Sequence, residues 1–202
     1  MTIEKGQPWG KPGGLPDTGV VVSTDREAAL VVTEARRAGL PLPVIGLLGG
    51  DLCRTLGGTG DEGRLRSAEA MTFPVDLGSV LADGVHHLFV AHLVVRDAWW
   101  SDGFVAMNAQ WLGRLNLGPR AHPNDGRLDT YRITLNKADL LEVRRRARMG
   151  AHLPHPRLRE ERSAAVQASL DAARPVHVDG FVVGRAKNVS VRLEPDALTV
   201  VV

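Results

Sequence analysis

The chain is short of the residue types that mark several common classes of protein. Its 202 residues include one cysteine, Cys53, so an internal disulfide and a cysteine-based zinc site are excluded. No run of eighteen apolar residues occurs, and the first residues lack the apolar core of a signal peptide. We therefore expect a cytoplasmic protein without a transmembrane segment.

Cys53 has Leu52 and Leu56 as apolar neighbours in the sequence. Only Arg54, beside it, would lower the pKa of the thiol. Cys53 is therefore predicted to be a small buried hydrophobic residue, and a reactive thiol is the alternative.

Positive charge is concentrated in the second half of the chain. Residues 1–101 hold 9 Lys and Arg against 12 Asp and Glu, whereas residues 102–202 hold 16 against 11. This asymmetry favours an anionic partner, such as a phosphate group or an acidic membrane surface. The net charge of +2 is too small to indicate nucleic acid.

Glycine and proline dominate residues 5–19, so residues 1–14 are predicted to form an irregular arm that Trp9 fixes to the body. The segment that follows, residues 15–66, has the pattern of a small α/β unit. Its apolar runs at 20–22 and 44–48 predict two strands, and a capped amphipathic stretch between them predicts a helix that ends at Gly39. Strand, helix, strand predicts a parallel pair.

The periodicity changes near residue 67. Runs rich in β-branched residues predict strands at 71–80, 88–95, 104–109, 130–135, 181–183, 189–193 and 198–202. One helix, over 137–149, interrupts them. We expect an α+β fold in which the small α/β remnant precedes a predominantly antiparallel β-sandwich-like domain, residues 67–202.

Ordered motifs in the second half resemble a known family. They are AsnAspGlyArgLeuAsp at 124–129, GlyAlaHisLeuProHisPro at 150–156 and ValHisValAspGly at 176–180. Together they resemble the C-terminal half of the diacylglycerol kinase and sphingosine kinase superfamily of lipid kinases. The chain looks like a truncated, degenerate member, because the units that precede residue 15 in the family have no counterpart here.

The resemblance implies cofactor contacts at Asp25, Gly49, Gly50 and Asp51. GlyGlyAspLeuCysArgThrLeuGly at 49–57 is similar to a nucleotide-site motif of the family. The preceding glycine-rich loop is reduced to SerThrAspArgGlu at 23–27, in which only Asp25 matches. Side chains at Thr24 and Arg26 would keep a phosphate from the main chain, which argues against ATP as a ligand.

Asp125 is the candidate metal ligand. The resemblance implies a Mg²⁺ ion held by Asp125 and the main chain at Leu128, with Asp129 a weaker partner, and hard cations prefer such oxygen ligands. The alternative is a plain hairpin turn, because AsnAsp and AspGly are common turn sequences.

Phe181 follows AspGly, where the resemblance implies a glutamate that acts as general base. A phenyl ring accepts no proton, and loss of such a group typically costs about 10²- to 10⁴-fold in rate. We therefore expect a non-catalytic lipid-kinase-like protein that binds an anionic ligand or a protein partner, or that assembles into a homo-oligomer. The alternative is an active ATP- and Mg²⁺-dependent lipid kinase with rearranged catalytic groups.

Arg144, Arg145 and Arg148 belong to the densest cluster of charge. On the helix expected at 137–149 they form either a solvated face or a site for a phosphate or anionic lipid headgroup. Trp99 and Trp100 either pack against the body or mark a membrane or partner contact. Seven histidines occur, but no metal-binding spacing such as HExxH supports zinc.

Overall fold

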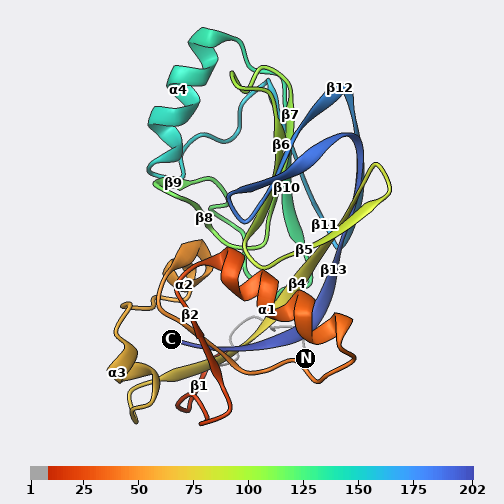
Figure 1. The fold of residues 1–202 in the computed structure, drawn as a ribbon. Coiled ribbons are helices and arrows are strands. Elements are labelled where there is room, and N and C mark those ends of the chain that lie inside the picture. The colour runs from red at the N-terminus through yellow and green to blue at the C-terminus, as the bar shows by residue number, and fades with distance from the viewer. Residues whose placement is uncertain (1–8) are drawn as a thin grey trace.

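The computed structural model describes residues 9–202, and one large sheet dominates it (Figure 1). Among the described residues this sheet has 11 strands, mostly antiparallel, and β8 and β9 form a separate pair. The strands are β1 (Lys11–Pro12), β2 (Val20–Val22), β3 (Ile45–Leu47), β4 (Met71–Ala82), β5 (Val85–Phe89), β6 (His92–Arg96), β7 (Gly103–Met107), β8 (Trp111–Leu112), β9 (Leu115–Asn116), β10 (Leu128–Ile133), β11 (Leu158–Ser163), β12 (Ala165–Val178) and β13 (Phe181–Val201). The helices are α1 (Asp25–Arg37), α2 (Gly50–Thr55), α3 (Glu62–Leu65) and α4 (Lys137–Ala147).

The predicted α/β unit is present. β2 and β3 pair in parallel, with α1 between them in the chain. Thr24 caps α1 by accepting a hydrogen bond from the N–H of Glu27. α1 buries its apolar side on the cluster that contains Val32, Ile45 and Leu47. The sequence signals for this unit therefore agree with the structure.

β13 joins the α/β unit to the rest of the protein. It pairs antiparallel with β4 and β12 along most of its length and in parallel with β3 at its end. The three segments predicted as strands near the C-terminus are strand in the structure, but their separation is wrong, because they form one strand of 21 residues with an irregularity between Glu194 and Leu198. Strands on both sides of residue 66 belong to the same sheet. The boundary predicted there between two domains stays a prediction.

Two other strand predictions need correction. The run 88–95 is split by a turn into β5 and β6, because Asp179 binds the main chain at residues 90–92 and pulls it out of a straight strand. β11 and the first part of β12 were missed because their strands are rich in exposed charged or small residues and lack an apolar run. The antiparallel, sandwich-like character of this part is as expected.

The core lies in several clusters, on different sides of the sheet. One cluster is formed by side chains of β4, β5, β6, β7, β10, β12 and β13 and includes Phe89, Leu93 and Phe104. Another lies under α4 and includes Tyr131 and Val143. Figure 1 shows α1 across the middle of the molecule and α4 on the outer edge of the β-rich part, well separated from each other.

The arm predicted over residues 1–14 is described only from Trp9 onward, and its first eight residues lie outside the described part. Trp9 donates a hydrogen bond to the carbonyl of Pro74 and packs on Phe73 and His122. It therefore fixes the arm to β4, as predicted.

Within residues 9–202, no helix is both long enough and apolar enough to cross a membrane.

Gly78 in β4 offers a test of the packing inside the sheet. A Cβ at this position would lie 2.2 Å from the ring of Phe89, which is fully buried. We expect Gly78→Ala to lower the free energy of unfolding by about 1–3 kcal/mol through overpacking, as measured by urea denaturation. Gly63→Ala is the control, because the nearest atom there is 3.3 Å away. Equal losses in the two variants would contradict this account.

Candidate ligand-binding site

Asp25 connects the first turns of α1 and α2. Its Oδ2 accepts a hydrogen bond from the N–H of Asp51 at 2.5 Å, and its Oδ1 accepts one from Leu52 at 3.1 Å. Gly50 has a φ of +95°, and a Cβ there would lie 2.4 Å from Asp25 Oδ1. Glycine at this position is therefore what lets the carboxylate reach the start of α2.

The structure also requires glycine at position 49. It is the N-cap of α2, and a Cβ there would lie 2.6 Å from the carbonyl oxygen of Ser23. The structure thus brings together all four residues predicted to contact a cofactor, namely Asp25, Gly49, Gly50 and Asp51. Two N–H groups at the start of α2, however, already donate to Asp25, so they are not free for a phosphate.

Asp51 links α2 to two parts of the β-rich region. Its Oδ2 lies 2.9 Å from Nε2 of His92, and the N–H of Gly113 donates to the same carboxylate at 2.9 and 3.0 Å. Burial acts to raise the pKa of Asp51, but the hydrogen bonds from His92 and Gly113 outweigh it, and the net effect is to lower the pKa.

Asp179 occupies the tight turn between β12 and β13, with a φ of +47°. Its carboxylate accepts three main-chain hydrogen bonds, from Val90 at 2.9 Å, Ala91 at 2.9 Å and His92 at 3.0 Å. Burial raises the pKa of Asp179, while these donors and the nearby His92 ring act to lower it. The side chain therefore holds the β5–β6 turn in place.

Asp25, Asp51, His92 and Asp179 form one cluster, which we call the acid cluster. Burial, and then the charge of Asp179, raise the pKa of Asp25 to about 7. Burial acts to lower the pKa of His92, but the hydrogen bond with Asp51 and the neighbouring carboxylates raise it overall. Donor atoms of Asp25, Asp51 and His92 lie within 4.8 Å of one another, so the cluster has the dimensions of a cation site.

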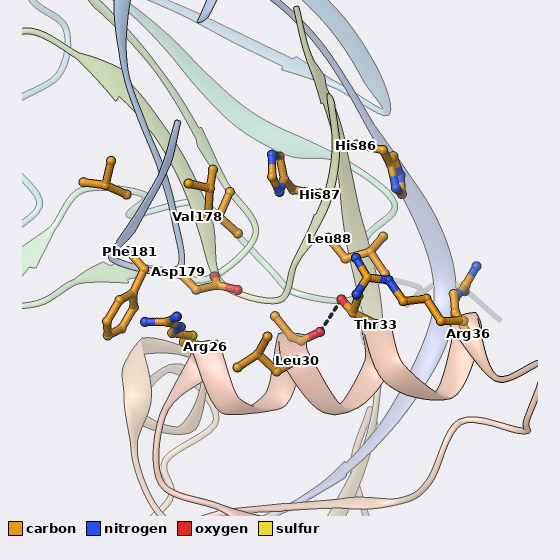
Figure 2. Close-up of a pocket in the computed structure, with 14 residues that line it drawn as sticks. Arg26, Leu30, Thr33, Arg36, His86, His87, Leu88, Val178, Asp179 and Phe181 are labelled. Carbon is orange, nitrogen blue, oxygen red and sulfur yellow. Dashed lines mark hydrogen bonds between the residues drawn. The ribbon is translucent and has the colours of Figure 1, made fainter. Parts of the chain in front are cut away.

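A pocket of about 400 Å³ opens beside the acid cluster, between α1, β5 and the β12–β13 turn (Figure 2). Its cationic and titratable lining consists of Arg26, Arg36, Arg37, His86, His87 and Asp179. The Arg26 guanidinium lies 3.8 Å from the centre of the Phe181 ring, and Arg36 is paired with Glu194 at 2.6 Å. Burial, together with the charge of His86, lowers the pKa of His87.

The pocket also has apolar walls. They are formed by Ala29, Leu30, Leu88, Val178, Val182 and Val183. Phe181 is 45% exposed at the rim, and Figure 2 shows Arg26 and Leu30 facing the pocket from α1. The pocket thus combines guanidinium groups with an apolar surface, and the one carboxylate in its described lining, that of Asp179, is already bonded to the main chain.

Asp125 and Leu128, the predicted magnesium ligands, lie apart from this pocket. The Arg162 guanidinium binds Oδ2 of Asp125 and Oδ1 of Asp129, each at 2.5 Å. Asp125 also accepts a hydrogen bond from the N–H of Arg127. These carboxylates already have a cationic partner, so the residues present do not fit a magnesium ion well. The prediction of Mg²⁺ at this turn stays untested.

The turn around Asp125 has a structural anchor that the sequence did not reveal. Buried Asp76 accepts hydrogen bonds from the N–H groups of Gly126 and Asp196, at 2.8 and 2.9 Å. These bonds hold the AsnAspGly turn against β4, in keeping with the plain turn that was the alternative.

The arginines predicted to bind an anion lie apart from both the pocket and the turn at Asp125. Arg144, Arg145 and Arg148 are exposed on or just after α4 and take no part in the pocket beside the acid cluster. The structure therefore separates the three predicted sites.

Cys53 is buried near the acid cluster, and burial, together with the charge of Asp25, raises the pKa of its thiol to about 11. This is the inert thiol that was predicted.

Sequence reasoning missed His92 and the basic lining of the pocket. His92 was noted only as one of seven histidines, and nothing beside it in the chain pairs it with Asp51, 41 residues away. Arg26, Arg37 and His87 are likewise brought together by the contact of α1 with β5. The AspGly pair at Asp179 was the sequence signal that pointed to this part of the structure.

Comparison with known proteins gives the class. Residues 72–202 match the model of the family described as the YegS C-terminal NAD kinase beta sandwich-like domain. The chain therefore belongs to this family, and it is a lipid-kinase-like protein of the kind that its motifs resemble. The search of curated proteins gave no match.

Solved structures show the same fold at low sequence identity. A putative diacylglycerol kinase from Bacillus anthracis str. Sterne has a TM-score of 0.57 and 14% identity, over 79% of this chain and 68% of that one. A second structure, of a diacylglycerol kinase from the same source, has a TM-score of 0.55 and 15% identity, over 79% and 66%. This chain thus spans about two thirds of the proteins that it resembles.

Asp25 should give the protein a distinctive dependence on pH. Asp25→Ala leaves two buried N–H groups without an acceptor, so we expect a loss of about 2–4 kcal/mol at pH 5. The folded carboxyl has a pKa of about 7, against 3.8 as the ordinary value. The folded state therefore binds the extra proton between these values, and the stabilisation that Asp25 provides is complete below pH 3.8 and lost as the pH rises to 7.

Urea denaturation of both proteins at several pH values measures this effect. The stability difference between wild type and Asp25→Ala should shrink by about 1–3 kcal/mol between pH 5 and pH 7.5. Exposed Asp17→Ala is the control and should leave stability and its pH dependence unchanged. A difference that stays constant over this range would show that Asp25 is ionised throughout.

Proposed function

We propose that this protein is a non-catalytic member of its family that binds an anionic ligand in the pocket between α1, β5 and the β12–β13 turn. The proposal depends on the hydrogen bonds that the Asp179 carboxylate accepts. Among residues 9–202 it is the only carboxylate lining that pocket, and its two oxygens already accept three main-chain hydrogen bonds. The described lining of the pocket therefore offers no further acid to take a proton from a substrate hydroxyl.

Phe181 supports the same conclusion. It lies two residues after Asp179, at the position where the resemblance implies a glutamate base, and its ring contacts Arg26. A cation stacked on an aromatic ring is held in place without being neutralised. The Arg26 guanidinium therefore keeps hydrogen-bond donors available for an incoming anion.

The lining also indicates the chemistry of the ligand. Guanidinium groups favour phosphate, which they bind by charge-assisted hydrogen bonds. The apolar wall, with Leu30 and Val182, favours an acyl chain or another apolar group attached to that phosphate. A phosphate monoester with one short acyl chain matches both parts.

Calorimetric titration with a short-chain lysophosphatidate tests the proposal. The lysophosphatidate should bind more tightly than either inorganic phosphate or the uncharged monoacylglycerol. Arg26→Ala should weaken binding by about 10- to 100-fold, because it removes a charged hydrogen-bond donor. Arg127→Ala, at an exposed position in the turn near Asp125, should leave affinity unchanged. Equal affinity for the charged and uncharged ligands would overturn the proposal.

An active kinase is the second candidate, and the acid cluster favours it. Donor atoms from Asp25, Asp51 and His92 lie close enough to share one ion. A site with an imidazole suits zinc better than magnesium, which prefers oxygen ligands. In this candidate the cluster would hold the ion that accompanies ATP.

The two candidates differ in the expected effect of restoring an acid at position 181. We expect no transfer of radiolabelled phosphate from ATP to diacylglycerols or sphingoid bases, with Mg²⁺ or Mn²⁺, by the wild-type protein or by Phe181→Glu. The reason is that Asp25 already occupies the N–H groups at the start of α2. If Phe181→Glu gains about 100-fold or more in transfer rate, the nucleotide site is intact and the kinase candidate is favoured.

A further inference from the structure

The outer face of α4 carries a row of cations around one exposed leucine. At 3.6 residues per turn, Lys137, Leu141, Arg144, Arg145 and Arg148 fall within an arc of about 100°. All five are exposed. The inner face of the helix holds Leu140, Val143 and Ala147, which pack on the cluster beneath it. The outer cations are thus not needed to attach α4 to the protein.

Large apolar side chains lie exposed at the ends and in the middle of this face. Leu141 is 74% exposed, Met149 is 73% exposed and Trp99 is 66% exposed. Trp99 belongs to the β6–β7 loop, and its ring lies 5.7 Å from Nζ of Lys137. It therefore extends the face beyond the first turn of α4. We call these three residues, with the four cations, the α4 face.

The carboxylates of the described residues do not neutralise the arginines of the α4 face. The nearby acids are already engaged, since Glu142 pairs with Arg146 and Asp139 pairs with Arg157. No ion pair forms between a carboxylate of the described residues and Arg144, Arg145 or Arg148. The surface thus presents concentrated positive charge.

We propose that the α4 face docks the protein onto an anionic lipid bilayer. Arginine and lysine gain energy near a surface of acidic headgroups, while tryptophan, leucine and methionine gain by entering the interface between headgroups and acyl chains. A polyanion such as nucleic acid would be served by the cations alone and leaves the exposed Leu141 and Met149 without a role. The membrane accounts for both kinds of side chain.

The position of the α4 face suits such an attachment. Figure 1 shows α4 at the outer edge of the β-rich part, away from α1 and the N-terminal α/β unit. Docking there leaves the pocket beside α1 uncovered. This inference is independent of the proposed function, because no residue is shared between the two surfaces.

Vesicle flotation tests the inference with the intact chain. We expect binding to vesicles of phosphatidylglycerol and phosphatidylcholine, little binding to phosphatidylcholine alone, and weakening as salt rises. The double variant Arg145→Ala and Arg148→Ala should bind about 30-fold more weakly, because each cation near an anionic surface contributes about a fivefold factor. Both side chains are exposed, so the melting temperature should not change.

Matched controls separate this site from general charge attraction. Arg127→Ala with Arg192→Ala removes the same charge from exposed positions off α4 and should keep binding near the wild-type level. Leu141→Ala and Trp99→Ala should each weaken binding although neither changes the charge of the protein. If both double variants weaken binding equally, or if the apolar variants have no effect, the α4 face is not a membrane site. Equal binding to neutral vesicles would overturn the inference as well.

Discussion

The clustering of three aspartates and one histidine, of which Asp25, Asp179 and His92 are buried and Asp51 is partly buried, is the constraint on which the rest of the structure depends. Asp25 joins α1 to α2, Asp51 joins α2 to β6, and Asp179 joins the β12–β13 turn to the β5–β6 turn. Buried carboxylates must be hydrogen-bonded or neutralised, because an isolated charge in the interior is costly. Here each carboxylate is satisfied by a segment distant in the chain. The α/β unit and the β-rich part are thereby held together.

This use of the acids limits the chemistry that they can perform. A general base needs a lone pair directed at the substrate, and a phosphate site at a helix start needs free N–H groups. Asp179 and Asp25 have their oxygens turned to main-chain donors, and the N–H groups of Asp51 and Leu52 are taken. The acid cluster acts in this structure as a connector. A cation could still enter between Asp25, Asp51 and His92, but only by replacing hydrogen bonds that the fold uses.

The sequence predicted what depends on local pattern. Strands β2 and β3, helices α1 and α4, and the antiparallel second part follow from periodicity and capping residues such as Thr24. Pairings over long distances were out of reach. The contact of His92 with Asp51, and the basic pocket between α1 and β5, bring together segments that lie far apart in the chain. The same limit explains Asp125, where Arg162, 37 residues further on, supplies the cation.

The positions where the resemblance implies a departure from the family pattern form one local structure. The resemblance implies a glycine-rich loop in place of Thr24 and Arg26, and an acid in place of Phe181 at the other side of the pocket. Thr24 caps α1, which fixes the first turn of the helix, and that turn presents Arg26 to the face of Phe181 at 3.8 Å. A glutamate at position 181 would instead neutralise Arg26, and a glycine at position 26 would leave Phe181 without its partner. Arg26 and Phe181 are thus partners in one contact at the rim of the pocket, which supports the proposed use of the pocket as a basic, partly apolar binding surface.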